Sequence, residues 1–458
     1  MRDLLRRCEP FGYQFGVIDR MMCHWRRFCL GVFAVSVILL QALAAPPQVP
    51  KPAGSLSLDD CIHLANSAPS AVTQARQQLE IARRGITEAR AGFLPEAHFN
   101  GAYTYNSPLL DALLPQSFSF VALNGIREYA TQVGTGVELD TSGRLRAAMR
   151  RAEADRDAST AGLGLSQRDL KRAVAAAYYR LLLARRLVQV DHDSLEEARS
   201  FEDLVTKLLK GGEAAQADLY KAQAQTAFLE QAAISSELDA QLANQDLASY
   251  WTASVEQTLN IQDIFNQEPP PPETSAQLGA TPFLGRPEFR LFDAQKRSFL
   301  ADARQARSTL YPQTTLDFQW GLDSNYFAFH DRGYAAFLTL NVTLWDWFKT
   351  RSAEKQFELQ AAQVDANADI AKRTFSRDYQ AALARVQSTY RQIEVTQRQT
   401  KASEENLRLS RVRYEGGEGL ALDVVAAMQQ LVQARSSYFA ALANYYNARA
   451  DLEVAAAL

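Results

Sequence analysis

Two long stretches without proline constrain the fold of this chain more than any other feature. Residues 143–209 contain no proline, and small or apolar residues recur in them at spacings of three and four, the pattern of a packed helix. Residues 350–414 also lack proline and repeat part of this pattern. A helix of about 65 residues spans about 100 Å, whereas a compact globule of this chain length has a radius of gyration of about 23 Å. We therefore predict two protruding helices, with a break at Gly162 and Gly164 as the alternative for the first.

The predicted helices have alanine-rich and only weakly apolar seams. Such seams suit helices packed side by side into a tube with a wet inner face. They also suit a closed antiparallel coiled coil with a dry core. The sequence favours neither arrangement over the other.

The chain contains two copies of one unit. Val137 to Asp140 is matched by Val342 to Trp345, and Gly211 to Glu213 is matched by Gly416 to Glu418. Both matches have the same offset of 205 residues, which indicates a repeat. Four prolines in a row at 269–272 predict a stiff linker between the copies. Each copy reads helix, hairpin, helix, glycine turn, helix. The predicted parts are a first repeat at residues 45–266, a linker at 267–285 and a second repeat at 286–458.

Residues 1–44 have the pattern of a secretory signal peptide. Arg26 and Arg27 precede an apolar run at 28–40, and small residues at Ala42 and Ala44 provide a cleavage site. We interpret Met21 or Met22 as the true start. The apolar run is too short to span a bilayer as a helix, and no later run reaches about twenty apolar residues. Any membrane insertion must then use strands.

Charge and motifs exclude several classes of function. Residues 1–44 hold six Lys/Arg and three Asp/Glu, so the rest has 43 basic and 49 acidic residues and a net charge of −6, which disfavours nucleic acid as a partner. We find no phosphate-binding loop, nucleophile elbow or zinc-type cysteine pair. His192 stands between two aspartates, but neighbouring residues on a helix point in different directions. We therefore expect no enzyme, no cofactor and no metal site.

Four segments alternate apolar and polar side chains with a period of two, which predicts strands with one apolar face. They are residues 96–106, 129–140, 316–323 and 334–344. A strand of about ten residues crosses a bilayer at a tilt, so we predict membrane strands; a soluble sheet covered by helices is the alternative for any single strand. The predicted lipid-facing residues are Phe99, Tyr103, Val133, Val137, Leu316, Phe318, Trp320, Leu338, Leu340 and Val342.

Four strands are too few to close a barrel, and lipid does not tolerate open sheet edges. Other copies of the chain must then pair with the edges. Two copies would give eight strands and a lumen filled by side chains, whereas three would give twelve strands and room for a channel. We expect three copies.

Paired glycines predict the ends of the long helices. Gly211 with Gly212, and Gly416 with Gly417, can adopt a positive φ and let the chain reverse. Asp218 and Asp423 follow in the first turn of the returning helix, where a carboxylate caps the helix or opposes its dipole. In a second interpretation the copies of these tips surround a constriction, and the aspartates form an acidic ring.

These parts together resemble the TolC-like outer-membrane efflux family over essentially the whole mature chain. The matching pieces are Leu58 to Ala65, Leu94 with Pro95, Arg286 to Phe289, Leu310 to Pro312, and Tyr414 to Gly417 with Asp423. The resemblance supports three copies. It implies a mainly α protein whose homotrimer joins a twelve-stranded barrel in the outer membrane of a Gram-negative bacterium to a periplasmic tube of antiparallel helices. Such ducts serve tripartite efflux or type I secretion, together with a periplasmic adaptor and an inner-membrane pump, and catalyse nothing themselves.

The resemblance also implies how the inner end is closed. In well-known members a tyrosine, an arginine five residues on, an aspartate nine residues on and sometimes a second aspartate hold it shut. Tyr414 and Asp423 match this pattern, but Gly419 stands at the arginine position and Ala426 at the second aspartate position. We therefore expect the constriction to depend on Tyr414, Asp423 and packing.

A periplasmic adaptor or rod-like coiled-coil scaffold is the main alternative function. It would also have a signal peptide and long helices, but with one helical hairpin and no lipid-facing strands. The four strands and the duplication disfavour it. Because a wide, wet duct has no selective pocket, the sequence favours no substrate class among drugs, metal ions, metabolites and proteins.

Overall fold

The computed structural model describes residues 55–107, 127–273, 279, 281–327, 330 and 332–457. The predicted signal peptide and residues 274–278 and 280 of the predicted linker lie outside the described residues. The chain divides into two units, Met1–Ser55 and Leu56–Leu458, and every element named below belongs to the second.

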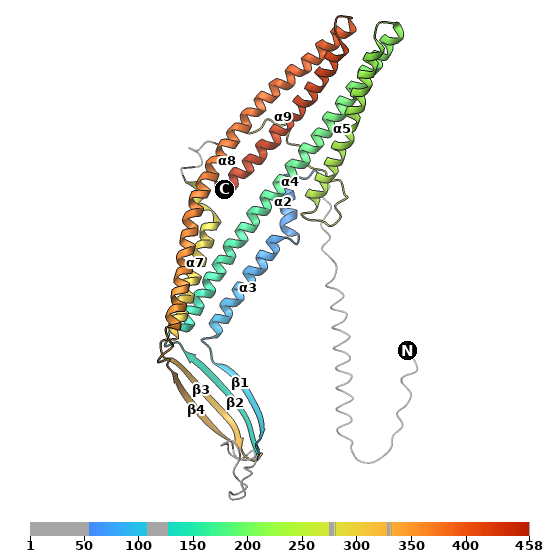
Figure 1. The fold of residues 1–458 in the computed structure, drawn as a ribbon. Helices are drawn as coiled ribbons and strands as arrows, with labels where there is room; N and C mark the ends of the chain where they lie inside the picture. Colours follow the sequence, from blue (N-terminus) through green and yellow to red (C-terminus); the bar gives the residue numbers. More distant parts are fainter. Residues whose placement is uncertain are drawn as a thin grey trace, which may run out of the picture. The chain divides into compact units, whose positions relative to one another are not determined.

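Two continuous helices form the framework of this unit (Figure 1). They are α4 (Arg144–Gly211, 68 residues) and α8 (Lys349–Glu415, 67 residues). At 1.5 Å per residue each spans about 100 Å. The two proline-free stretches predicted as helices end within two residues of these bounds. Gly162 and Gly164 lie inside α4 and do not interrupt it, so the alternative with a broken helix is wrong.

Each long helix is followed by a helix that returns along it. α5 (Gln216–Ala248) packs against α4, and α9 (Ala421–Ala455) packs against α8 (Figure 1). α9 also contacts α4, so the two helical hairpins are joined within one chain. Several of the regularly spaced small or apolar residues of α4 are buried, namely Val174, Leu181, Leu195, Ala198 and Val205.

Shorter helices precede each pair of strands. α2 (Leu58–Ser67) and α3 (Ala71–Ala91) lie against α4. The 3₁₀ helix η1 (Pro282–Gly285) leads into α7 (Pro287–Ser308), which packs between α4 and α8. Pro287 suits the first position of α7 because a helix needs no N–H group there.

The strands form one antiparallel sheet with the order β1-β2-β3-β4. Their bounds are β1 (Glu96–Tyr105), β2 (Arg127–Leu139), β3 (Gln313–Ser324) and β4 (Arg332–Asn341). The fold is thus mainly helical with a four-stranded antiparallel sheet, as the sequence predicts. β1 and β4 are the edge strands of this sheet among the described residues.

The last strand is shorter than predicted. β4 ends at Asn341, which pairs with Gln313, so Val342 lies one residue beyond the strand. The residue opposite Val342 would be Pro312, just before β3, and proline has no N–H to donate to a β-ladder hydrogen bond. The prediction that Val342 belongs to the strand is therefore wrong.

Tyrosines connect the helices to the end of the first copy and to the linker that follows it. Tyr178 and Tyr445 are fully buried in the main apolar core, and their hydroxyls donate to the carbonyl oxygens of Gln262, at 2.7 Å, and Pro270. Phe283, which lies within the predicted linker, is buried in the same core. The end of the first copy and the described part of the linker, which includes Pro270 and Phe283, therefore pack onto the helices.

No helix in the part of the chain that the structure describes is both long and apolar enough to cross a membrane.

Candidate functional site

The sheet separates apolar from polar side chains. Residues directly opposite one another in an antiparallel pair project to the same face. Phe99 pairs with Val133 and Val133 with Trp320, while Leu316 pairs with both Val137 and Leu338. By the same register, every predicted lipid-facing residue that lies within a strand shares one face. These residues are Phe99, Tyr103, Val133, Val137, Leu316, Phe318, Trp320, Leu338 and Leu340.

The apolar face is uncovered in the single chain. Trp320 is 51% exposed and Leu338 is 70% exposed, although both are large and apolar. Monomeric proteins rarely expose a contiguous patch of this kind, so such a face indicates an interaction surface.

The opposite face of the sheet is polar. Its register positions include His98, Gln132, Asp317 and Thr339, and the Gln132 amide nitrogen lies 3.4 Å from a carboxylate oxygen of Asp323. The sheet therefore has one face suited to lipid or protein and one suited to water.

The far ends of the two helical hairpins are glycine turns. Gly212 has φ +80° and ends α4, and the N–H of Glu213 donates to the carbonyl of Leu208 at 2.9 Å. Gly417 has φ +73° in the turn after α8. Gly211 and Gly416 do not have a positive φ, so only the second glycine of each predicted pair needs the left-handed conformation.

The two predicted tip aspartates have different surroundings. Asp423 Oδ2 accepts a hydrogen bond from the N–H of Leu420, the N-cap residue of α9, at 3.3 Å. Asp218 in α5 instead accepts one from the ammonium group of Lys221 at 3.1 Å. Asp423 thus caps the N-terminus of α9, while Asp218 forms an ion pair with a lysine three residues later in α5.

Tyr414 lies where the two hairpins meet. Its ring is 7% exposed and packs edge to face on Phe201 of α4, with 5.3 Å between ring centroids. Its hydroxyl is buried without a hydrogen-bond partner among the described residues. Burial and the nearby carboxylate of Asp218 raise the pKa of Tyr414 above its ordinary value. The structure therefore packs Tyr414 on Phe201, with the carboxylate of Asp218 near enough to raise the pKa of the tyrosine hydroxyl.

Two hydrogen bonds add to this junction of the tips. Arg411 Nη2 donates to Ser200 Oγ at 3.0 Å, and Gln429 Nε2 donates to Gln225 Oε1 at 2.9 Å. Sequence reasoning missed these residues and Phe201. The spacing of the repeat could not identify them, because it matches positions between the copies and not contacts.

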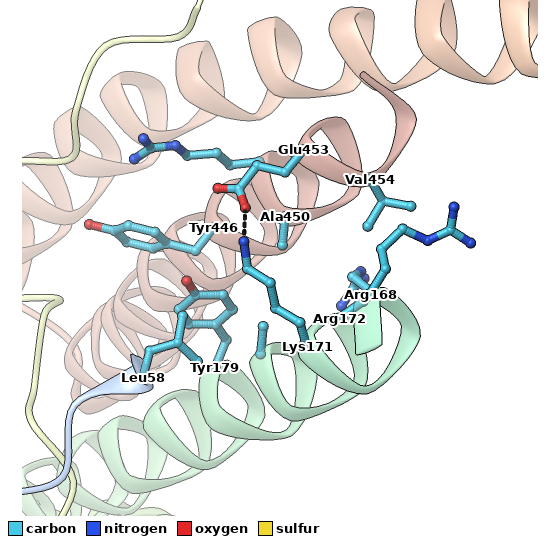
Figure 2. A pocket seen from close by; sticks show the side chains of 11 residues that line it. Leu58, Arg168, Lys171, Arg172, Tyr179, Tyr446, Ala450, Glu453 and Val454 are labelled. Carbon is cyan, nitrogen blue, oxygen red and sulfur yellow. Dashed lines mark hydrogen bonds and ion pairs between the residues drawn. The ribbon is translucent and has the colours of Figure 1, made fainter. Parts of the chain in front are cut away.

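A small cavity lies between α4 and α9, near the start of α2 (Figure 2). Its volume is about 120 Å³, and the stacked rings of Tyr179 and Tyr446 line it. The Lys171 ammonium group lies 3.0 Å from a carboxylate oxygen of Glu453, as Figure 2 shows. Arg168 is likewise paired, with Glu288 of α7 at 2.8 Å. Because carboxylates of neighbouring helices already pair with these cations, we interpret the cavity as part of the packing between helices and not as a binding site.

The chain matches known proteins along most of its length. A family model described as outer membrane efflux protein matches residues 62–253 and 284–457. A comparison with curated proteins finds no match.

Several solved structures have the same fold. The outer membrane protein VceC from Vibrio cholerae matches with a TM-score of 0.74 at 16% identity, over 87% of this chain and 95% of that one. The CmeC outer membrane channel of Campylobacter jejuni matches with a TM-score of 0.77 at 14% identity, over 90% of each chain. The MtrE outer membrane channel of Neisseria gonorrhoeae, in its open state, matches with a TM-score of 0.72 at 20% identity, over 87% of this chain and 88% of that one.

At these identities the structural similarity establishes the fold, and the family match establishes the relationship. None of these three proteins is described as an enzyme. By the family model, which spans more than half of its residues, this chain belongs to the outer membrane efflux protein family.

Proposed function

We propose that this chain is the outer-membrane channel subunit of a tripartite efflux or type I secretion system. In this proposal it forms a passive trimeric export duct through the outer membrane and the periplasm. The observation that carries the proposal is the sheet, which has an uncovered apolar face, a polar face and two edge strands.

The edges of the sheet favour assembly from several copies. β1 and β4 present N–H and C=O groups that a bilayer would leave without partners. Pairing β4 of one protomer with β1 of the next satisfies these groups and places every apolar face outward. Three protomers supply twelve strands, enough for an open lumen lined by the polar face.

The helix α5 supports contact between copies through a second apolar face. Tyr220, Leu229, Leu238 and Leu247 follow one another at intervals of nine residues, or two and a half turns, so that they point alternately to opposite sides. Leu229 and Leu247 are buried in the protomer, whereas Tyr220 and Leu238 are exposed. We assign the exposed side to the helices of a neighbouring copy.

The glycine tips are the proposed inner aperture. Tyr414 and Asp218 would stabilise the junction of the two hairpins in each protomer, and Asp423 would contribute a carboxylate to a ring around the axis. Asp423 lines a surface cavity of about 340 Å³ together with Arg413 and Gly419. A periplasmic adaptor would bind the helical end, and an inner-membrane pump would supply the energy.

Cell fractionation combined with bilayer recording tests this proposal. We expect the protein in the outer-membrane fraction, a detergent-solubilised particle with the mass of three protomers, and ion currents after reconstitution into planar bilayers. A water-soluble monomer without channel activity would contradict it and would favour a periplasmic scaffold.

A further inference from the structure

The segment between β4 and α8 carries an exposed aromatic cluster, formed by Trp345, Trp347 and Phe348. The ring of Trp345 lies 5.8 Å from that of Trp347 and 5.5 Å from that of Phe348, in both cases edge to face. These side chains are 64%, 82% and 55% exposed, respectively. The rings contact one another, but more than half of each side chain remains uncovered by the protomer.

The backbone of this cluster is unfavourable for its residues. Trp347 has φ +55° and Phe348 has φ +60°, the left-handed region in which a Cβ crowds the following carbonyl oxygen. At the offset of 205 residues Phe348 corresponds to Gly143, which has φ +78°. Both residues are the N-cap of a long helix. Since glycine begins the helix in the first copy, the start of a helix does not account for phenylalanine in the second.

The surroundings of the cluster indicate what covers it. It begins four residues after the end of β4, whose Leu338 and Leu340 are exposed on the apolar face. It lies where the sheet meets the long helices (Figure 1). Lys349 and Arg351 come next, and the Arg351 guanidinium lies 5.9 Å from the centre of the Phe348 ring. Aromatic rings with adjacent cations suit the interface of a bilayer, where rings lie at headgroup level and cations face phosphates.

We propose that Trp345, Trp347 and Phe348, together with Lys349 and Arg351, anchor the sheet in the headgroup layer of the inner leaflet. The inference rests on the proposed function, in which the apolar face lies in lipid. The left-handed backbone holds the rings at the level where the chain leaves the bilayer. The first copy has aspartate, serine and glycine at the corresponding positions 140, 142 and 143, so each protomer carries one such anchor.

Fluorescence quenching by lipids labelled at different depths tests the anchor. The chain has five tryptophans, and two variants each keep one of them, Trp320 or Trp347, with the others replaced by phenylalanine. Both are reconstituted into phosphatidylcholine and phosphatidylglycerol vesicles with a quencher near the headgroup or deep in the acyl chain. We expect Trp347 to be quenched about twofold more by the shallow label, and Trp320 more by the deep label.

The two tryptophans separate the inference from the proposed function. If neither is quenched at any depth, the sheet is not in lipid and the proposed function fails together with the anchor. If Trp320 is quenched and Trp347 is not, the apolar face lies in lipid but the anchor is overturned, and a neighbouring copy is the better candidate to cover the cluster.

A second experiment replaces the strained residues with those of the first copy. The double variant Trp347→Ser, Phe348→Gly should fold in detergent micelles with an unchanged or higher thermal midpoint, because glycine suits the left-handed N-cap. It should assemble into vesicles more slowly and in lower yield than the wild type. Wild-type assembly by this variant would overturn the anchor.

Discussion

Tyr414 is a single residue on which the junction of the two hairpins depends. Its ring fills the space against Phe201, while its hydroxyl is buried without a partner among the described residues. The ring should therefore stabilise the junction, and the hydroxyl should oppose burial. In the family pattern this tyrosine belongs to a polar latch, but the geometry gives it a packing role within one protomer.

Two substitutions separate the ring of Tyr414 from its hydroxyl. Tyr414→Phe should leave the free energy of unfolding unchanged or raise it by up to about 1 kcal/mol, because no hydrogen bond is lost. Tyr414→Ala should lower it by about 3 to 5 kcal/mol, because it leaves a cavity. Denaturant unfolding in detergent measures both. A large loss in Tyr414→Phe would mean that the hydroxyl has a partner in the assembly.

Gly419 has no room for a side chain. A Cβ at this position would lie 2.9 Å from the backbone nitrogen of Tyr414, so Gly419→Ala should lower the free energy of unfolding by about 1 to 3 kcal/mol. It should also speed tryptic cleavage after Arg413. An arginine at this position would meet the same crowding, because its Cβ would lie equally close to the Tyr414 nitrogen.

Gly211→Ala is the matched control for this prediction. A Cβ at Gly211 meets nothing closer than 4.0 Å, and alanine favours a helix by about 0.5 to 1 kcal/mol. Equal losses in the two variants would contradict the assigned crowding at Gly419.

At the scale of elements, the sheet has an apolar and a polar face. Substitutions at neighbouring positions of one strand place a charge on one face or the other and so test this assignment. Leu338→Arg should disfavour insertion by about 2 to 4 kcal/mol near the midplane of the bilayer, and Leu340→Arg should add to it. Thr339→Arg places the same charge on the opposite, polar face and should be tolerated. Heat-stable trimers in the outer-membrane fraction are the measurement. The reverse ranking would mean that the apolar face looks inward.

The two faces of α5 predict two different defects. Leu238→Lys should leave the protomer folded but prevent its association, because Leu238 is exposed in the protomer. Leu229→Lys, nine residues earlier and on the buried side, should unfold the helical hairpin, because a lone charge is costly in an apolar core. Circular dichroism reports folding, and sedimentation in detergent reports association. A stable trimer of Leu238→Lys would exclude this face from the contact between copies.

At the scale of the whole molecule, the proposed assembly repeats each tip three times around an axis. A ring of Asp423 carboxylates would concentrate cations at the aperture. Asp423→Asn removes the charge but keeps an oxygen that can accept from the N–H of Leu420, so it should reduce cation selectivity without loss of stability. The shift of the reversal potential in a salt gradient is the measurement.

Asp423→Ala should reduce cation selectivity equally and should also lower the free energy of unfolding by about 0.5 to 2 kcal/mol, because the helix start loses its acceptor. An unchanged reversal potential in Asp423→Asn would restrict this residue to capping. Asp218→Ala serves as a comparison, since the carboxylate of Asp218 is already paired with Lys221.

The sequence alone determined the helices, the strands and the turns. Absence of proline, the spacing of apolar residues and glycine placement predicted α4, α8 and their ends within two residues, because these features depend on neighbours along the chain. Alternation likewise assigned Leu338 and its partners to one face, because a strand has a period of two.

Only the tertiary structure decided which distant residues meet. It ended β4 before Val342, because Pro312, the residue just before β3, has no N–H to donate, and it placed Tyr414 on Phe201, far away in the sequence. It also gave Phe348 the conformation that Gly143 adopts in the first copy. Local periodicity carries no information on such contacts, since they form between segments that packing, and not chain order, brings together.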